Sequence, residues 1–428
     1  MADNCLLGLD IGVGSVKACV FHLEKKEEGK KIIIARDSRD MSGISAVIIG
    51  FGEAKINKPK SRQESEKEIV RECYMAKKEA ENMAGVVVDK AIIGATARFI
   101  KCSTNIFDFT RERPEKIISV FEIKNLLQRA QWKIFDKIRQ KEDLESGVFE
   151  TEIRLLSGEI AGIKIENYSV VDPIGFEGKE LTIAILNTYS SKSFLKIIQA
   201  LNKFLGIEIL SLAPFNRAVL EAISEHLLKA GNLGEASCFI VDCGDRTTDI
   251  SVAHKGFFIG PKAVGMGGSS FSRYLAAKFN LSEQEGEKLK IRYIAGDLSA
   301  QIKRKVTDAL SGLFNVWYKG IEEIIVDLSK TLSSLPHAFF IYGGGSLLGG
   351  FKKKLENPEW QKKFKFEGPI KIKEIKIEHF NRVEDRTGLL GKPDRIRLLA
   401  LASFSLKLTR KETELNSILN RVIRLMQN

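Results

Sequence analysis

Two segments of the chain have the same residue pattern at a constant offset of 232 residues, the difference between Asp10 and Asp242. Residues 6–21 are LLGLDIGVGSVKACVF and residues 238–253 are CFIVDCGDRTTDISVA. In each, an apolar run ends in Asp, a Gly-containing turn follows, and a second apolar run begins, which predicts a β-hairpin. The matched positions are Asp10 and Asp242, Gly12 and Gly244, Ser15 and Thr247, and Lys17 and Asp249. The repeat therefore predicts two related halves.

The turn of the first hairpin has the chemistry of an anion site. Gly12 and Gly14 permit positive φ and a close approach of the backbone to a ligand, and successive amides in such a turn bind anions. Asp10 would repel a phosphate there, unless a hydrated Mg²⁺ lies between them. Lys17 would add positive charge for the outer phosphates. One copy is equally compatible with an ordinary hairpin that has a polar tip, whereas two matched copies favour a nucleotide held between two domains.

Length and composition agree with this division. A chain of 428 residues with 44% hydrophobic residues suits two or more globular domains. The net charge of +12 makes an acidic partner plausible, such as anionic lipid, a nucleotide or an acidic peptide. The basic residues are spread along the chain without a zinc-finger spacing or an RNA-binding signature, so we expect no nucleic-acid partner.

Cysteine and histidine usage indicates a reducing compartment and no metal cluster. The six cysteines lack CxxC spacing and are expected to be small core residues of a cytoplasmic protein. The five histidines are scattered. The N-terminus has no signal-peptide core, and no apolar run approaches the roughly 18 residues of a membrane span.

The last residues have the pattern of an amphipathic helix. Arg421 and Arg424 lie on its polar side. One interpretation is a terminal helix packed on the domain; the other is an interfacial anchor, with the apolar face in the acyl boundary and the arginines at lipid phosphates. The apolar helix expected at 394–408 would already complete the first half, so a further helix has no obvious core, which favours the anchor. The apolar positions are Leu415, Ile418, Leu419, Val422, Ile423 and Met426.

Taken together, the motifs resemble the actin, heat-shock chaperone and sugar-kinase superfamily of ATPases. DIGVGSVK (10–17) is similar to its first phosphate motif, VDCGDRTTD (241–249) to the second, and IYGGGSLLGGF (341–351) to the adenosine motif. VGMGGSSF (264–271) is similar to the connecting loop, and EGEKLK (285–290) to the stretch that seats ribose and adenine. The resemblance implies an α/β actin-like ATPase fold, with two related lobes around a nucleotide cleft and a small α/β insertion in the first lobe.

Within this superfamily the chain is most similar to the bacterial cell-division family FtsA, and next to the pilus-assembly family PilM. The change of character over residues 101–178, a helix followed by short alternating strands, falls where FtsA carries its insertion. The implied division assigns 1–100, 179–235 and 394–408 to the first lobe, 101–178 to the insertion, 236–269 and 335–393 to the second lobe, 270–334 to its helical subdomain, and 409–428 to a C-terminal amphipathic membrane-targeting helix.

The resemblance also implies ATP and Mg²⁺ as ligands. Asp10 and Asp242 would hold Mg²⁺ through water, and Asp245 would help to position water. Asn216 is the one residue near the place where actins keep a Gln or Glu that orients the attacking water, so we expect slow hydrolysis at most. Arg246 replaces a usual glycine and either grips the γ-phosphate or points to solvent. The implied nucleotide-binding residues are Gly12, Val13, Gly14, Ser15, Lys17, Gly244, Arg246, Thr247, Gly267, Gly268, Glu287, Lys290, Gly343, Gly344, Gly345 and Ser346.

Three functions follow from these similarities. The FtsA resemblance implies a cell-division protein that binds ATP, polymerises with further copies of itself, and tethers filaments of the tubulin homologue FtsZ to the anionic inner face of the cell membrane at the division site. The PilM alternative implies a cytoplasmic adaptor that binds a membrane-protein peptide beside the insertion and needs no anchoring helix. A small-molecule kinase would need a catalytic carboxylate and a sugar pocket, for which no candidate stands out. The absence of GxxxxGK[ST] excludes a P-loop, and the glycines at 343–350 do not fit GxGxxG.

Overall fold

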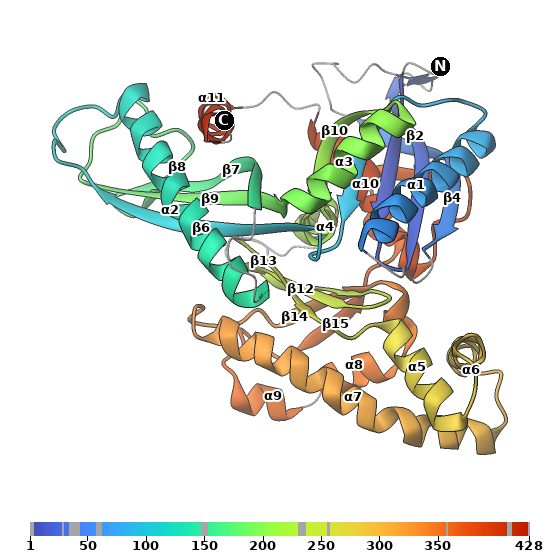
Figure 1. Cartoon of the computed structure of the whole chain (residues 1–428). Coiled ribbons are helices and arrows are strands. Elements are labelled where there is room, and N and C mark those ends of the chain that lie inside the picture. Colours follow the sequence, from blue (N-terminus) through green and yellow to red (C-terminus); the bar gives the residue numbers. More distant parts are fainter. Residues whose placement is uncertain are drawn as a thin grey trace.

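The computed structural model describes residues 4–27, 30–33, 43–56, 62–146, 153–229, 237–254, 257–356, 358–408 and 413–426. These residues form two lobes and an α/β insertion that extends from the first lobe (Figure 1).

The first lobe is built on a sheet of strand order β10-β5-β1-β2-β4-β16, with β3 paired to β2. Both faces are covered, because side chains of a strand alternate between faces and every residue of β1 is buried. Helices α1 (Arg62–Ala84) and α3 (Lys192–Leu205) pack on one face, and α4 (Phe215–Lys229) and α10 (Ile396–Leu408) on the other. The strands are β1 (Cys5–Ile11), β2 (Ser15–Glu27), β3 (Lys30–Ile33), β4 (Ile44–Lys55), β5 (Lys90–Ala95), β10 (Glu208–Pro214) and β16 (Val383–Asp385).

The second lobe is built on a sheet of order β13-β12-β11-β14-β15. One face packs on the helical layer through aromatic residues such as Trp317 and Phe351, and the other joins the core around α4. The strands are β11 (Cys238–Cys243), β12 (Thr248–His254), β13 (Phe257–Val264), β14 (Ala338–Tyr342) and β15 (Lys371–Glu374). The helices are α5 (Gly268–Phe279), α6 (Glu283–Ala295), α7 (Ala300–Ser329), α8 (Gly350–Leu355) and α9 (Pro358–Lys363), with 3₁₀ turns η2 (Gly344–Leu347), η3 (Ile377–His379) and η4 (Pro393–Arg395).

The two sheets repeat each other strand for strand. In β10-β5-β1-β2-β4 the first two pairings are parallel and the next two antiparallel. In β15-β14-β11-β12-β13 the pairings have the same order and directions. The predicted two related lobes are confirmed, and each predicted phosphate hairpin is the central antiparallel pair of its sheet.

The insertion is an antiparallel sheet of order β6-β9-β7-β8 with helix α2 (Val120–Ser146) on it. Its strands are β6 (Ile100–Thr110), β7 (Ile153–Ile165), β8 (Tyr168–Val170) and β9 (Glu180–Ser191). The sheet therefore takes in β9, which lies beyond residue 178. Glu159 on β7 ties the insertion to the first lobe, since its carboxylate lies 3.0 Å from Lys407 Nζ on α10 and 3.4 Å from Arg217 Nη2 on α4.

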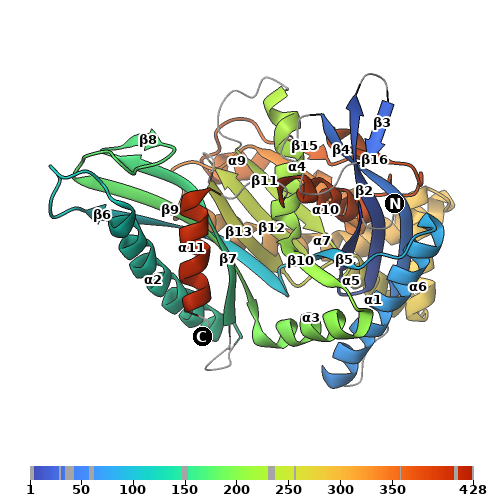
Figure 2. The ribbon, with the colours of Figure 1, turned by 90° about the horizontal axis from the view of Figure 1, so that it is seen from above.

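The C-terminal helix α11 (Glu414–Leu425) lies beside α2, over β7 (Figure 2). Its apolar side chains Leu415, Leu419 and Ile423 are buried in the core of the insertion, Val422 is also buried, and Ile418 and Met426 pack at the edge. The insertion supplies a core for α11, so the expectation that this helix has no core to pack on is wrong. Arg421 and Arg424 are exposed.

Polar contacts fix the position of α11 as well. Asn416 Oδ1 accepts a hydrogen bond from the backbone N–H of Ile160 at 2.8 Å, and Asn420 Oδ1 accepts one from Gly158 at 2.9 Å. A Cβ added to Gly158 would lie 2.8 Å from methyl carbons of both Leu419 and Ile423. Glycine at this position therefore lets the helix approach the strand.

The six cysteines are all buried with free thiols, as expected for small core residues. Among the described helices, none is long and apolar enough to cross a membrane.

Candidate functional site between the two lobes

The turns of the two predicted hairpins are closed in the same way. Gly12 N–H donates to the Ser15 carbonyl at 3.1 Å, and Gly244 N–H donates to the Thr247 carbonyl at 2.9 Å. Asp10 is the second-last residue of β1 and pairs with Lys17, and Asp242 occupies the matching place on β11 opposite Asp249. The structural equivalence extends to single residues.

The two aspartates meet at a residue that no motif indicated. Arg397, the second residue of α10, places Nη2 2.7 Å and Nε 2.9 Å from Asp242 Oδ2, and Nη1 3.7 Å from Asp10 Oδ1. A Cβ added to Gly12 would lie 3.8 Å from Nη1, and one added to Gly244 would lie 3.2 Å from Nη2. The guanidinium group therefore lies against both turns. The available sequence signal was a lone arginine near the start of an apolar helix, in the stretch IRLLALA.

Burial and this guanidinium set the charge state of the site. Burial raises the pKa of Asp10 and of Asp242, and Arg397 opposes the rise in both. Burial would lower the pKa of Arg397, but Asp242 and Asp10 raise it above its ordinary value. Burial, reinforced by Asp242, raises the pKa of Asp249 to about 6. Arg397 thus stays charged and is the main neutralising partner of the two carboxylates.

The carboxylates of Asp10 and Asp242 are the groups that were expected to hold Mg²⁺ through water. Oδ1 of Asp10 and Oδ1 of Asp242 are buried without a hydrogen-bond partner among the described residues, so they could accept bonds from water. A hydrated Mg²⁺, however, needs an octahedral shell at about 2.1 Å with several waters. Arg397 lies between the carboxylates, and the side chains so arranged do not fit such an ion between them. No group of three or more His, Cys, Asp or Glu able to hold a metal occurs in the described part of the chain.

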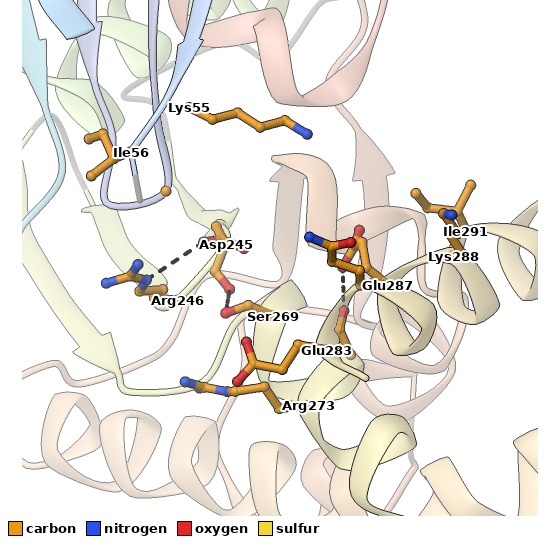
Figure 3. Close-up of a pocket in the computed structure, with 13 residues that line it drawn as sticks. Lys55, Ile56, Asp245, Arg246, Ser269, Arg273, Glu283, Glu287, Lys288 and Ile291 are labelled. Atoms are coloured by element: carbon orange, nitrogen blue, oxygen red, sulfur yellow. Dashed lines mark hydrogen bonds and ion pairs between the residues drawn. The ribbon is translucent and has the colours of Figure 1, made fainter. Parts of the chain in front are cut away.

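Beside the turns lies a cleft of about 760 Å³ (Figure 3). The first lobe contributes Gly14, Lys55 and Ile56, and the second contributes Asp245 and Arg246. A Cβ on Gly14 would lie 2.2 Å from Asp245 Oδ2, so the turns of the two lobes touch there. Helices α5 and α6 complete the cleft with Ser269, Ser272, Arg273, Glu283, Gln284, Glu287, Lys288 and Ile291.

Lys17 and Arg246 are both held by carboxylates. Lys17 Nζ is buried and lies 3.5 Å from Asp394 and 3.6 Å from Glu53, with Ser15 Oγ at 3.2 Å. Arg246 Nε lies 3.8 Å from Asp245 Oδ2 at the wall of the cleft. Two of the predicted phosphate-binding residues, Lys17 and Arg246, thus place basic side chains at the two turns.

The predicted connecting loop and ribose stretch also gather at the second turn. Gly268 N–H donates to the Gly244 carbonyl at 2.9 Å. Lys290 Nζ lies 3.2 Å from the Gly268 carbonyl and 2.8 Å from Glu287 Oε2, and Ser272 donates to the same carboxylate. Residues 267–290, far from the first hairpin in sequence, therefore form one wall of the site.

The glycine loop after β14 lies against Asp242. Gly343 has φ +91°, and a Cβ there would lie 2.7 Å from Asp242 Oδ1. Its N–H donates to the Pro393 carbonyl at 3.2 Å, which joins this loop to the turn that precedes α10. Ser346 Oγ donates back to the Gly343 carbonyl at 2.7 Å. The loop that includes Gly344 and Gly345 thus lies beside both Asp242 and the turn that precedes α10.

Asn216 is not brought to the surface of the cleft. It is buried at the start of α4, where Nδ2 donates to Ser251 Oγ at 2.9 Å and Oδ1 accepts from the Tyr342 hydroxyl at 2.7 Å. Its amide links α4 to β12 and β14. The role predicted for it, orientation of an attacking water, stays a prediction.

Comparison with known proteins addresses the fold. No protein-family model matches this chain, and no curated protein matches it in sequence. Its structure is similar to a chain of the PilM-PilN type IV pilus biogenesis complex, with a TM-score of 0.59 and 13% identity over 94% of this chain and 98% of that one. It also matches ethanolamine utilization protein EutJ from Carboxydothermus hydrogenoformans (TM-score 0.42, 14% identity, 94% and 89% covered). A further match is (R)-2-hydroxyglutaryl-CoA dehydratase component A of Acidaminococcus fermentans, with a TM-score of 0.38 and 8% identity over 95% of this chain and 100% of that one. The chain has the actin-like ATPase fold.

Proposed function

We propose that this chain is a nucleotide-binding adaptor that uses an actin-like fold to hold a segment of a partner protein. The observation that carries the proposal is the buried apolar face of α11. An interfacial anchor needs that face free for acyl chains, whereas Leu415, Leu419 and Ile423 lie in the core of the insertion. The similar structure of the PilM-PilN complex contains a chain of this fold together with a partner, which supports the same kind of role.

Nucleotide binding is supported by the paired turns. The amides of Gly12 and Gly244 close the two turns, whereas those of Val13, Gly14, Asp245 and Arg246 donate no backbone hydrogen bond among the described residues. These four amides, with Lys17 beside the first turn, provide the donors that phosphate oxygens need. The cleft of about 760 Å³ between the lobes has the volume of a ligand site. ATP is the ligand that this arrangement fits best.

A groove between α1 and α3 fits the partner segment. It has a volume of about 940 Å³, an apolar floor that includes Val70 and Ile197, and at its edge Phe204, whose surface is 64% exposed. Its lining contains one acidic residue, Glu66, and four basic ones: Lys67, Arg71, Lys196 and Lys203. Apolar pockets ringed by positive charge favour an amphipathic peptide with acidic side chains.

Peptide selection on the immobilised full-length chain tests the adaptor function. We expect enriched peptides to combine acidic and large apolar residues, and their affinity to fall about tenfold or more in Phe204→Asp and in Lys196→Glu/Lys203→Glu. Lys133→Glu, an exposed charge reversal on α2, is the matched control and should leave affinity unchanged. Peptides that bind both groove variants as well as the unchanged chain would refute this groove as the partner site.

The second candidate is the division protein that tethers FtsZ filaments to the membrane, and the amphipathic pattern of α11 favours it. That function requires α11 to leave the insertion, with Arg421 and Arg424 at lipid phosphates. Co-sedimentation with anionic vesicles, with and without ATP, compares the full chain with Arg421→Glu/Arg424→Glu. The adaptor predicts no lipid binding by either form. Lipid binding that the double reversal abolishes would replace the adaptor with the division protein.

A further inference from the structure

A buried cation, Arg397, lies at the two turns beside the cleft, between the aspartates where the superfamily resemblance implied a metal ion. We propose that Arg397 is the resident cation of the nucleotide site, so that the chain binds the phosphates of ATP without a divalent metal. This inference rests on the nucleotide binding proposed above and adds to it the charge that receives the phosphate.

The position of the guanidinium group is the first argument. Its nitrogens lie within 3.8 Å of the Cβ positions that Gly12 and Gly244 lack, so it is against both predicted phosphate turns at once. Arginine has five N–H donors, and Asp242 Oδ2 engages Nε and Nη2. Nη1 is 3.7 Å from Asp10 Oδ1, longer than a hydrogen bond, which leaves its hydrogens for a ligand. Guanidinium binds phosphate oxygens in a bidentate manner.

The surroundings of Arg397 are the second argument, because they hold it in place. Its side chain is 11% exposed and its guanidinium carbon lies 5.0 Å from the centre of the Phe215 ring. The residues on either side of it in α10, Ile396 and Leu398, are fully buried in the core of the first lobe. A shift of the backbone at this point would disturb that core, so the side chain is carried by a rigid element.

The charge balance is the third argument. Asp10 and Asp242 are both buried, and removal of Arg397 would leave two like charges close together in a medium of low polarity. A divalent ion that entered while Arg397 stayed would meet a positive charge at short range. Arg397 and a metal ion would therefore occupy the same position between the two aspartates. Arg397 is part of the chain and is always present there, so it excludes the ion.

Metal dependence of nucleotide binding tests the proposal without any variant. The full-length chain is titrated with a fluorescent ATP analogue in excess MgCl₂ and again in excess EDTA. We expect dissociation constants that agree within about threefold, because the guanidinium group supplies the charge in both buffers.

Variants then assign the effect to this residue. In Arg397→Ala the affinity in EDTA should fall about tenfold or more, and Mg²⁺ should restore part of it, because the two carboxylates are free to bind the ion. Arg111→Ala is the matched control: it removes another buried guanidinium, which pairs with Glu122 in the insertion at 2.7 Å, and should leave the ratio of the two affinities unchanged. Circular dichroism verifies that each variant is folded. If Arg397→Ala does not fold, the comparison of MgCl₂ and EDTA on the unchanged chain alone tests the proposal.

The outcomes separate this inference from the proposed function. Binding in MgCl₂ that is lost in EDTA would overturn the role of Arg397 and leave the nucleotide-binding adaptor intact. Absence of binding in both buffers would overturn the nucleotide part of the proposed function and this inference with it. Equal affinity in the two buffers, with affinity in EDTA lost in Arg397→Ala and kept in Arg111→Ala, supports the role of Arg397.

Discussion

Replacement of Leu419 by Ala should loosen helix α11 from the insertion. Leu419 is fully buried, whereas Leu425 on the same helix is 65% exposed. Truncation of a buried leucine removes apolar contact and leaves a cavity, at a cost of about 3 kcal/mol. The same truncation of an exposed leucine costs less than about 0.5 kcal/mol. Leu419→Ala and Leu425→Ala are chemically identical changes that differ in burial alone.

Hydrogen exchange of the full chain measures this difference locally. The amides of Gly158 and Ile160 donate to Asn420 and Asn416, so they become free to exchange when α11 opens. A loss of about 3 kcal/mol in the opening free energy makes these amides exchange about 150-fold faster, and Leu425→Ala should accelerate them by less than about threefold. If both variants exchange at the rate of the unchanged chain, α11 is not held by Leu419 in solution, and the membrane anchor regains support.

Three further changes test other parts of the structure. Burial lowers the pKa of His22, so below about pH 6.5 the unfolded chain takes up a proton that the folded chain does not, and the free energy of unfolding falls as the pH drops. His22→Gln should reduce this loss, which is measured as the difference in melting temperature between neutral and mildly acidic buffer. Gly312→Ala, in the interior of α7 with no atom within 4 Å of the added Cβ, should stabilise the chain by about 0.5–1 kcal/mol in thermal unfolding, and a lower melting temperature would contradict it. Asn216→Leu leaves the hydroxyls of Tyr342 and Ser251 without this partner and should cost about 2–3 kcal/mol in urea unfolding, a loss that an amide serving only the cleft would not produce.

The repeated hairpin predicted the fold because its signal is local. Strand periodicity and the turn glycines lie within about sixteen residues of each other, and the same pattern recurs at Asp242. Arg397 follows Asp242 by 155 residues on an apolar helix, so nothing in its neighbourhood relates it to either turn. Its role depends on the way α10 packs between the first sheet and the second hairpin, which only the tertiary structure specifies.

The C-terminal helix shows a second limit of sequence reasoning. The spacing of Leu415, Leu419 and Ile423 identifies an apolar face, but a lipid surface and a protein core select the same face. The distinguishing residues are Asn416 and Asn420, one turn apart, whose side chains meet the backbone of β7. Their significance depends on the strand opposite them, which the sequence does not place.

Helix α10 connects the candidate site with the insertion. Arg397 at its first turn contacts the hairpin of the second lobe, and Lys407 near its last turn contacts Glu159 of the insertion. Ten residues separate them, or about 15 Å of helix. One packed helix therefore joins the two aspartates to the insertion, so the position of the insertion and the arrangement of the two turns depend on the same element.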